Sequence, residues 1–351
     1  MTGSLAHAEA RAMTRSLARH GYLRRPTLGT GARGGRREWL YFSAGDASFD
    51  LIVNLSAVDD LRPAGAGGER IRLTVLVRVG EHWDGDVDEI DAELAGGALH
   101  ARFPGGEIAV RDGALRVTAA LRRRPIALDL RIVPNAFPSL VHNIALGAGQ
   151  AIQWLVVPRA TADGWFQLAD HRQPVAGAPA YHDHNWGDFT HQNFAWLWGH
   201  AASDAASEPI AIVLTRMVDG AQATAYLQAL LVWHGPRLVR VFRGSEIRIE
   251  PVGWLRRPRC FTVPRIGGLL AGATVTEVPQ RLRLHASGDG DELEGEFIAH
   301  DLARIALPND HDLGTTFIHE VIGRLQMSGS IRGTPVAIDA RAVFELLRSE
   351  P

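Results

Sequence analysis

Residues 181–200 read YHDHNWGDFTHQNFAWLWGH and place four histidines, two aspartates and three tryptophans in one short segment. A carboxyl group held among aromatic rings loses hydration, which favours its neutral form and raises its pKa. Such a group can stay protonated near neutral pH and donate a proton to an apolar substrate. Asp183 is the candidate acid, and Tyr181 is the candidate to hold it by a hydrogen bond or to relay its proton.

Strand geometry sorts this segment into two faces, because successive side chains of an extended chain point in opposite directions. If the segment is a strand, one face carries Tyr181, Asp183 and Asn185, and the other carries His182, His184 and Trp186. The same alternation puts Trp196 and Trp198 on one face of the next strand.

The candidate site contains two groups of residues. Tryptophan rings can face a positive charge, and each such contact is worth about 0.5 to 2 kcal/mol. The catalytic candidates are Asp183, Tyr181 and His184. The substrate-binding candidates are Trp154, Asn185, Trp186, Trp196, Trp198, Glu38 and Trp39.

Two other interpretations of the segment stay open. In the first, His182 and His184 form an HxH metal-binding pair on one strand, with His191 or a distant carboxylate as third ligand. In the second, Asp183 and Asn185 satisfy backbone groups in a buried hydrogen-bonded cluster, and the neighbouring tryptophan fills the core. His319 and Glu320, on a late strand, are further residues that a site could use.

Composition excludes several classes of protein. The chain has 351 residues, a formal net charge of −2, one cysteine (Cys260) and no lysine. A single cysteine excludes disulfide frameworks, thiolate zinc sites and CxxC redox chemistry within the chain. The absence of lysine excludes Schiff-base enzymes and P-loop nucleotide hydrolases. Near-neutral charge argues against nucleic acid as a partner.

The spacing of apolar residues along the sequence indicates the strands that must position these candidate residues. In IRLTVLVRV (71–79) and PIALDLRIV (125–133), every second residue is apolar, which is typical of a half-buried strand. Similar short runs follow at 49–57, 114–121, 210–218, 238–242, 246–250, 281–286, 295–299, 322–331 and 336–347. Many short strands separated by turn residues predict antiparallel barrels, whereas no GxGxxG sequence opens a helix after a strand.

The length fits two domains better than one wide barrel. We expect an N-terminal helix and lead-in over residues 1–36, with Leu5, Met13 and Leu17 on one side. An N-terminal lipocalin-like β-barrel is expected over 37–190 and a second over 191–351. Residues 170–180, DHRQPVAGAPA, have the Pro, Gly and Ala content of a linker.

Four segments resemble a known family. REWLYF (37–42), IQWLVVPRATADGWF (152–166), YHDHNWG (181–187) and GSIRGTPVAIDARAVFELL (329–347) resemble the hydroxyneurosporene synthase, or carotenoid hydratase, family. Its relatives include tocopherol cyclases, AttH-like proteins and fungal Diels–Alderases. The resemblance implies two lipocalin-like barrels, no organic cofactor and an isoprenoid, polyene or polyketide substrate. It also implies that Tyr181 and Asp183 are the acid site.

Three functions follow as hypotheses. The first is an acid-initiated hydratase or cyclase acting on an alkene, and the second is a cofactor-free pericyclase in which Tyr181, His184 or Asn185 polarises a dienophile. The third is a carrier of a hydrophobic ligand. The partner in each case is a hydrophobic small molecule. No apolar run is long enough to span a bilayer, so we expect a cytoplasmic protein with at most peripheral membrane contact.

Overall fold

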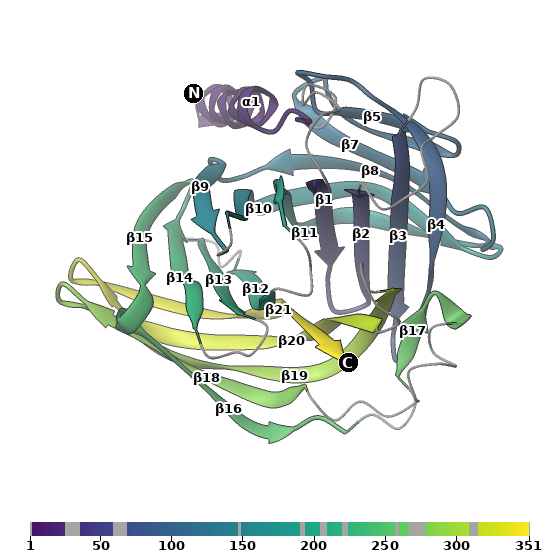
Figure 1. Ribbon diagram of the computed structural model, residues 1–351. Helices are drawn as coiled ribbons and strands as arrows, with labels where there is room; N and C mark the ends of the chain where they lie inside the picture. The colour runs from purple at the N-terminus through teal and green to yellow at the C-terminus, as the bar shows by residue number, and fades with distance from the viewer. Residues whose placement is uncertain are drawn as a thin grey trace. The chain divides into compact units, whose positions relative to one another are not determined.

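The computed structural model describes residues 2–24, 36–58, 69–146, 149–189, 194–203, 209–219, 224–256, 260–266, 278–308 and 315–350. Their secondary structure is almost entirely antiparallel β, with one helix, α1 (Thr2–His20), near the N-terminus (Figure 1). This confirms the predicted all-β class with a short N-terminal helix. The chain divides into two compact units, Met1–Phe189 (unit 1) and Thr190–Pro351 (unit 2).

Unit 1 is a closed antiparallel barrel. Its strands follow the order β11-β1-β2-β3-β4-β5-β6-β7-β8-β10, and β10 pairs back onto β11, which closes the ring. A further strand, β9, pairs with the first part of β10. The strands are β1 (Arg36–Gly45), β2 (Phe49–Val58), β3 (Glu69–Val79), β4 (His82–Leu94), β5 (His100–Phe103), β6 (Gly106–Arg111), β7 (Ala114–Ala120), β8 (Ile126–Pro134), β9 (Ser139–Ala145), β10 (Ala151–Leu168) and β11 (His171–Asp188).

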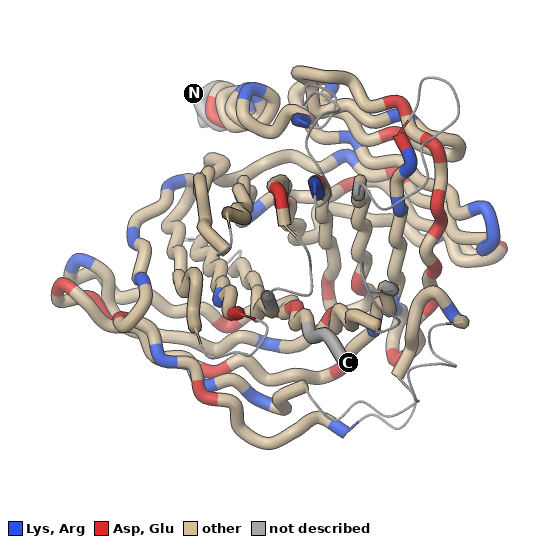
Figure 2. Tube along the Cα trace, in the orientation of Figure 1, with Lys and Arg blue, Asp and Glu red and all other residues tan. Residues whose placement is uncertain are grey.

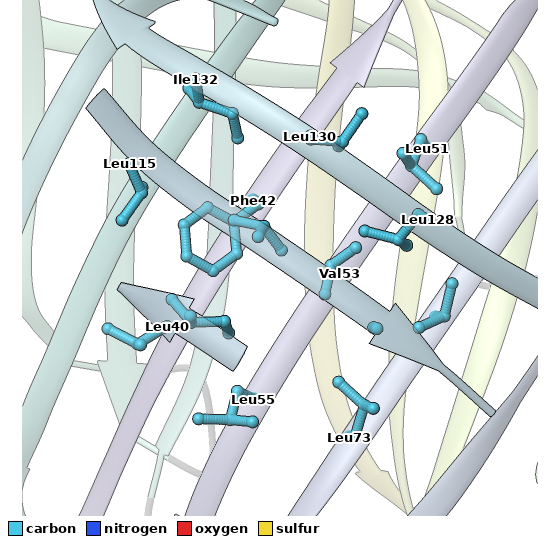
Figure 3. Close-up of a cluster of buried hydrophobic side chains, with 14 of the residues drawn as sticks. Leu40, Phe42, Leu51, Val53, Leu55, Leu73, Leu115, Leu128, Leu130 and Ile132 are labelled. Carbon is cyan, nitrogen blue, oxygen red and sulfur yellow. The ribbon is translucent and has the colours of Figure 1, made fainter. Parts of the chain in front are cut away.

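The interior of this barrel is the hydrophobic core of unit 1. Period-two alternation turns one face of each strand in the ring inward. Figure 3 shows Leu40 and Phe42 of β1 converging with Val53 of β2 and Leu130 of β8. These side chains are at most 2% exposed. Side chains of this kind fill the lumen, so the barrel has a packed centre.

Many charged residues lie on the outside of the barrel, and some of them pair across neighbouring strands. Acidic positions follow β4, as Figure 2 shows. Arg70 binds Asp91 at 2.8 Å on the adjacent strands β3 and β4. Arg124, from the turn before β8, forms an ion pair with Asp84, which lies opposite the core residue Val77. Carboxylates therefore balance both of these arginines locally.

Residues 170–180 correct one expectation from the sequence. Residues 171–180 form the first part of β11 and pair with β10 rather than acting as a linker, and Asp170 lies in the turn before the strand. The pairing tolerates this composition because register shifts interrupt it between Val157 and Ala160 and between Ala162 and Gly164. Gly164 has a φ of 138°, and a Cβ there would lie 2.0 Å from the carbonyl oxygen of Asp129.

The helix packs on unit 1 as its apolar side predicts. Met13 and Leu17 are 4% and 0% exposed, and the Thr14 hydroxyl donates to the Gly113 carbonyl at 2.8 Å. The side chain of Leu5 lies outside the described residues. Within the described part of the chain, no helix has the length and hydropathy that crossing a membrane requires.

Unit 2 is a second antiparallel sheet, in the order β15-β14-β13-β12-β21-β20-β19-β18-β16, with a short strand β17 parallel to β19. A turn of 3-10 helix, Gly244–Glu246, joins β15 to β16. The strands are β12 (Phe194–Ser203), β13 (Ile210–Asp219), β14 (Ala225–His234), β15 (Arg237–Arg243), β16 (Ile247–Trp254), β17 (Phe261–Val263), β18 (Pro279–Gly288), β19 (Asp291–Pro308), β20 (Thr315–Ile331) and β21 (Thr334–Glu350).

The sheet of unit 2 curls around its own core, which includes Leu214, Phe297, Val321 and Phe344 (Figure 1). Among the described residues, no pairing joins β15 to β16, so this sheet is open at that seam whereas the barrel of unit 1 is closed. The last strand, β21, lies in the middle of the order, between β12 and β20.

Candidate functional site

Three neighbouring strands of unit 1, β1, β11 and β10, build the candidate site. Their register puts Tyr41, Asp183 and Val156 in one row across the strands, and Trp39, Asn185 and Trp154 in the next. Directly paired residues share a face. Because Leu40 and Phe42 point into the core, these two rows lie on the opposite face, the outward face of the barrel.

Asp183 lies at the centre of this outward face and is 4% exposed. Its Oδ2 accepts a hydrogen bond from the Tyr181 hydroxyl at 3.0 Å and one from Trp154 Nε1 at 3.1 Å. Its Oδ1 accepts a third from Asn185 Nδ2 at 2.9 Å. Three candidate residues, Tyr181, Trp154 and Asn185, therefore surround Asp183, and strand alternation predicts that Tyr181 and Asn185 share its face.

Two physical effects act on the Asp183 carboxyl in opposite directions. Removal from water favours the neutral acid, whereas three donated hydrogen bonds favour the carboxylate. The indole N–H of Trp154 can only donate, so Oδ2 remains an acceptor in either protonation state. If the carboxyl is protonated, the proton is therefore best placed on Oδ1, where the Asn185 amide can turn to present its oxygen.

The other face of β11 looks into the barrel and holds a separate polar cluster. His184 Nε2 lies 2.7 Å from Glu38 Oε1, and both side chains are at most 5% exposed. The backbone N–H of Arg24 donates to the same Glu38 oxygen at 2.8 Å. The structure therefore separates His184 and Glu38 from Asp183, because residues one position apart on a strand face opposite ways.

Trp186 belongs to this inward cluster as well. The Arg24 guanidinium lies 3.7 Å from the centre of its ring, and the His184 ring lies 4.8 Å from it on the same strand. A cation–π contact from the protein's own arginine thus occupies a ring that the sequence suggested for substrate. Trp39, by contrast, lies on the outward face opposite Asn185, with its ring 5.7 Å from that of Phe189.

His182 shares the inward face with His184, which is the arrangement that the metal hypothesis needs. Its ring stacks on Phe42 at 4.5 Å, and its Nδ1 bonds with the Tyr41 carbonyl oxygen at 2.9 Å. Burial lowers the pKa of His182 to about 3, so it is neutral at physiological pH. The suggested third ligand, His191, lies outside the described residues, and within the described ranges no three His, Cys, Asp or Glu side chains are grouped for a metal.

Trp196 and Trp198 belong to unit 2, on the face of β12 opposite its core. Trp198 pairs directly with Glu345 of β21, and Glu345 pairs with Glu320 of β20. The Trp196 indole N–H donates to Glu345. Glu345 is not among the candidate residues of the sequence analysis, although its place inside the apolar run AVFELL indicates a carboxyl group on a buried strand.

Three solved structures share the fold of this chain. An AttH-like protein from Nitrosomonas europaea is 15% identical, with a TM-score of 0.63 over 91% of this chain and 98% of that one. Kievitone hydratase from Nectria haematococca is 11% identical, with a TM-score of 0.58 over 90% and 89%. CghA is 12% identical, with a TM-score of 0.59 over 90% and 88%.

At these identities the likeness establishes a shared all-β fold over nearly the whole chain and nothing about the reaction. No family model and no curated protein matches the sequence.

Proposed function

We propose that this protein is a cofactor-independent enzyme of the hydratase or cyclase type that protonates an alkene of a lipophilic substrate. Asp183 is the proposed acid and Tyr181 its hydrogen-bonding partner. The observation that carries the proposal is the burial of a carboxyl group, 4% exposed, among Tyr181 and Trp154 on the outward face of a barrel whose interior is filled. The fold shared with kievitone hydratase supports the same class of reaction.

The contacts of Asp183 suit a proton donor that must also stabilise its own product. Proton transfer breaks the carboxyl O–H bond, forms a C–H bond and leaves a carboxylate and a tertiary carbocation. The three donors to Asp183 stabilise that carboxylate, which strengthens the acid. Water or an internal nucleophile captures the cation, and the proton it loses restores the acid. The rings of Trp39 and Trp154 are the proposed apolar surface for an isoprenoid or polyene.

Asp183→Asn tests this proposal directly. Amide nitrogen cannot supply the proton, so turnover of acyclic isoprenoid alkenes should fall by about 10²-fold or more. Binding, followed by quenching of tryptophan fluorescence, should persist because the side chain keeps its size. The control is Asp188→Asn, an exposed aspartate on the same strand, which should keep full turnover. Turnover that survives in the Asp183 variant would remove the proposal.

A pericyclase is the second candidate, and one observation favours it. The three hydrogen bonds donated to Asp183 are those that hold an aspartate as its carboxylate, and a concerted cycloaddition needs no proton donor. Reaction in deuterated water separates the two candidates. An acid-initiated hydratase or cyclase installs one non-exchangeable deuterium in its product, whereas a pericyclase installs none. Ligand binding without any product would instead indicate a carrier.

A further inference from the structure

A second group of carboxyls lies in unit 2, on the face of the sheet opposite its core. Glu345 and Glu320 face one another on β21 and β20, and Glu320 is 1% exposed while Glu345 is partly buried. The strand pairing therefore holds two carboxyl groups side by side, and a hydrogen bond between them requires a proton on one of the two. Two carboxylates this close cannot both ionise without a large penalty.

The register extends this pair into a row across four strands. Thr215 of β13 pairs with Trp198 of β12, Trp198 pairs with Glu345, and Glu345 pairs with Glu320. All four side chains therefore share one face, and Thr215 lies two strand spacings, about 10 Å, from Glu345. The row on one side contains Trp196 and Leu347, and the row on the other contains His200 and Val343.

The same face also carries the Thr215 hydroxyl. Thr215 is 1% exposed, and its Oγ1 has no hydrogen-bond partner among the residues that the structure describes. A buried hydroxyl without a hydrogen-bond partner destabilises the fold unless something else bonds it. A ligand that lies along the Trp198 ring would reach this hydroxyl at one end and the carboxyl pair at the other.

We propose that Glu320 and Glu345 form a second acid–base centre, which holds one proton between two carboxyl groups and gives it to an apolar ligand that lies along Trp198 and bonds to Thr215. In the transfer, a carboxyl O–H bond breaks as the ligand gains the hydrogen. The pair changes from one negative charge to two, and the ligand becomes a cation. The ligand class is thus an elongated apolar molecule with a group that becomes cationic at one end and a hydroxyl or carbonyl at the other.

The surroundings of the pair suit a store for one proton. Desolvation raises the pKa of Glu345 to about 7, although the hydrogen bonds from Glu320 and Trp196 act in the lowering direction. On β12, His200 has a pKa well below 6.5, first because it is buried and second because of Arg341, so it stays neutral.

The remaining charged groups on this face lie further along the strands. Arg341 of β21 and Arg324 of β20 pair with each other two rows from Glu345, and Arg324 is bonded to Asp339. On β19, Asp301 lies one row from Glu320, and its Oδ1 accepts the backbone N–H of Leu302. None of these groups lies in the row of the pair.

The first measurement tests the shared proton. The full chain carries Asp183→Asn in this experiment, which removes any band from a neutral Asp183. Its infrared spectrum near neutral pH should contain the carbonyl band of a neutral carboxylic acid. That band should be lost in Glu345→Gln and in Glu320→Gln, and retained in Glu294→Gln, which changes an exposed glutamate of β19. A wild-type spectrum without the band at a pH of about 6 would overturn the proposal, even if a variant fails to fold.

The second measurement tests the ligand. The probe is an amino alcohol made from geraniol, with a dimethylamino group at the end opposite its hydroxyl. Calorimetry in two buffers of different ionisation enthalpy should give a release of about one proton per bound probe at a pH of about 6, because the cation displaces the shared proton. Glu345→Gln should abolish this release, Glu294→Gln should leave it unchanged, and Thr215→Val should weaken binding while the release persists. Equal proton release in the wild type and the Glu345 variant would overturn the assignment.

Both readouts are equilibrium properties of unit 2 residues. Their outcome is therefore independent of whether Asp183 is the acid of the proposed reaction.

Discussion

At the residue scale, each unit has a carboxyl group on the face opposite its core, and each of these groups accepts an indole N–H. Asp183 takes that hydrogen bond from Trp154, and Glu345 takes it from Trp196. An indole donor stabilises a negative charge while adding apolar surface, which a water molecule or a serine would not do. The difference between the sites is their partner: Asp183 has a tyrosine and an asparagine, whereas Glu345 has a second carboxyl.

His182 leads to a prediction about stability and pH. Its folded pKa of about 3 lies below the ordinary value of 6.5, so the unfolded chain takes up a proton that the folded chain refuses. Stability should therefore be complete above about pH 6.5 and decline as the pH falls toward 3, by at most about 1.4 kcal/mol per unit from this residue.

His182→Gln should make that decline shallower. Urea unfolding at pH values of about 7 and 5 measures the slope of unfolding free energy against pH. His171→Gln, an exposed histidine on the same strand, is the matched control and should leave the slope unchanged. An unchanged slope in the His182 variant would show that the histidine is charged or accessible in the folded protein.

At the element scale, a glycine packed against an aromatic ring helps to set the register of two strands in unit 2. Gly199 of β12 pairs with Phe344 of β21, and a Cβ on this glycine would lie 2.6 Å from the phenyl ring. The Phe344 ring in turn stacks on Phe297 at 3.9 Å. An aromatic side chain that covers a glycine across a strand pair fixes the register of both strands.

Gly199→Ala should accordingly destabilise the protein by about 1–3 kcal/mol through overpacking. The penalty should be smaller when Phe344 is replaced by leucine, because the smaller side chain leaves room for the added methyl group. A double-mutant cycle of unfolding free energies measures this coupling. Additive effects of the two substitutions would mean that the ring moves aside without cost.

The elements also show how far the sequence could predict the structure. Alternation in 181–186 predicted the two faces of β11, and with them the grouping of Tyr181, Asp183 and Asn185, because strand geometry is local. The composition of 170–180 predicts a linker, and this prediction is wrong. Register shifts in the β10–β11 pair tolerate the glycine and prolines, and no local sequence pattern reveals those shifts. Chemistry alone groups His184 with Asp183, whereas strand alternation separates them.

Contacts between distant strands could not be predicted. The pair Glu38–His184 joins residues 146 positions apart, and Glu320–Glu345 depends on the register of a hairpin. The position of Glu345 and Glu320 inside apolar runs was the available sequence signal for buried carboxyl groups. The partner of each carboxyl depends on the order of the strands, which a period-two pattern does not specify.

At the scale of the whole molecule, each unit has its own hydrophobic core, so each should respond separately to damage. Leu130 is 1% exposed in the barrel interior shown in Figure 3. Leu130→Ala should cost about 2–5 kcal/mol in unit 1. Hydrogen exchange followed by mass spectrometry should show faster exchange in β1 to β8, while β19 to β21 keep their protection. Equal loss in both units would show that they unfold as one.

The place of β21 in unit 2 has a consequence for synthesis on the ribosome. Residues 334–350 fill the slot between β12 and β20, so the edge of β12 stays unpaired until nearly all of unit 2 has been translated. A stop codon upstream of this strand would therefore split the sheet through its middle instead of trimming its border. Truncated products should be prone to aggregation. We expect chaperones to bind the nascent chain until β21 has emerged from the ribosome.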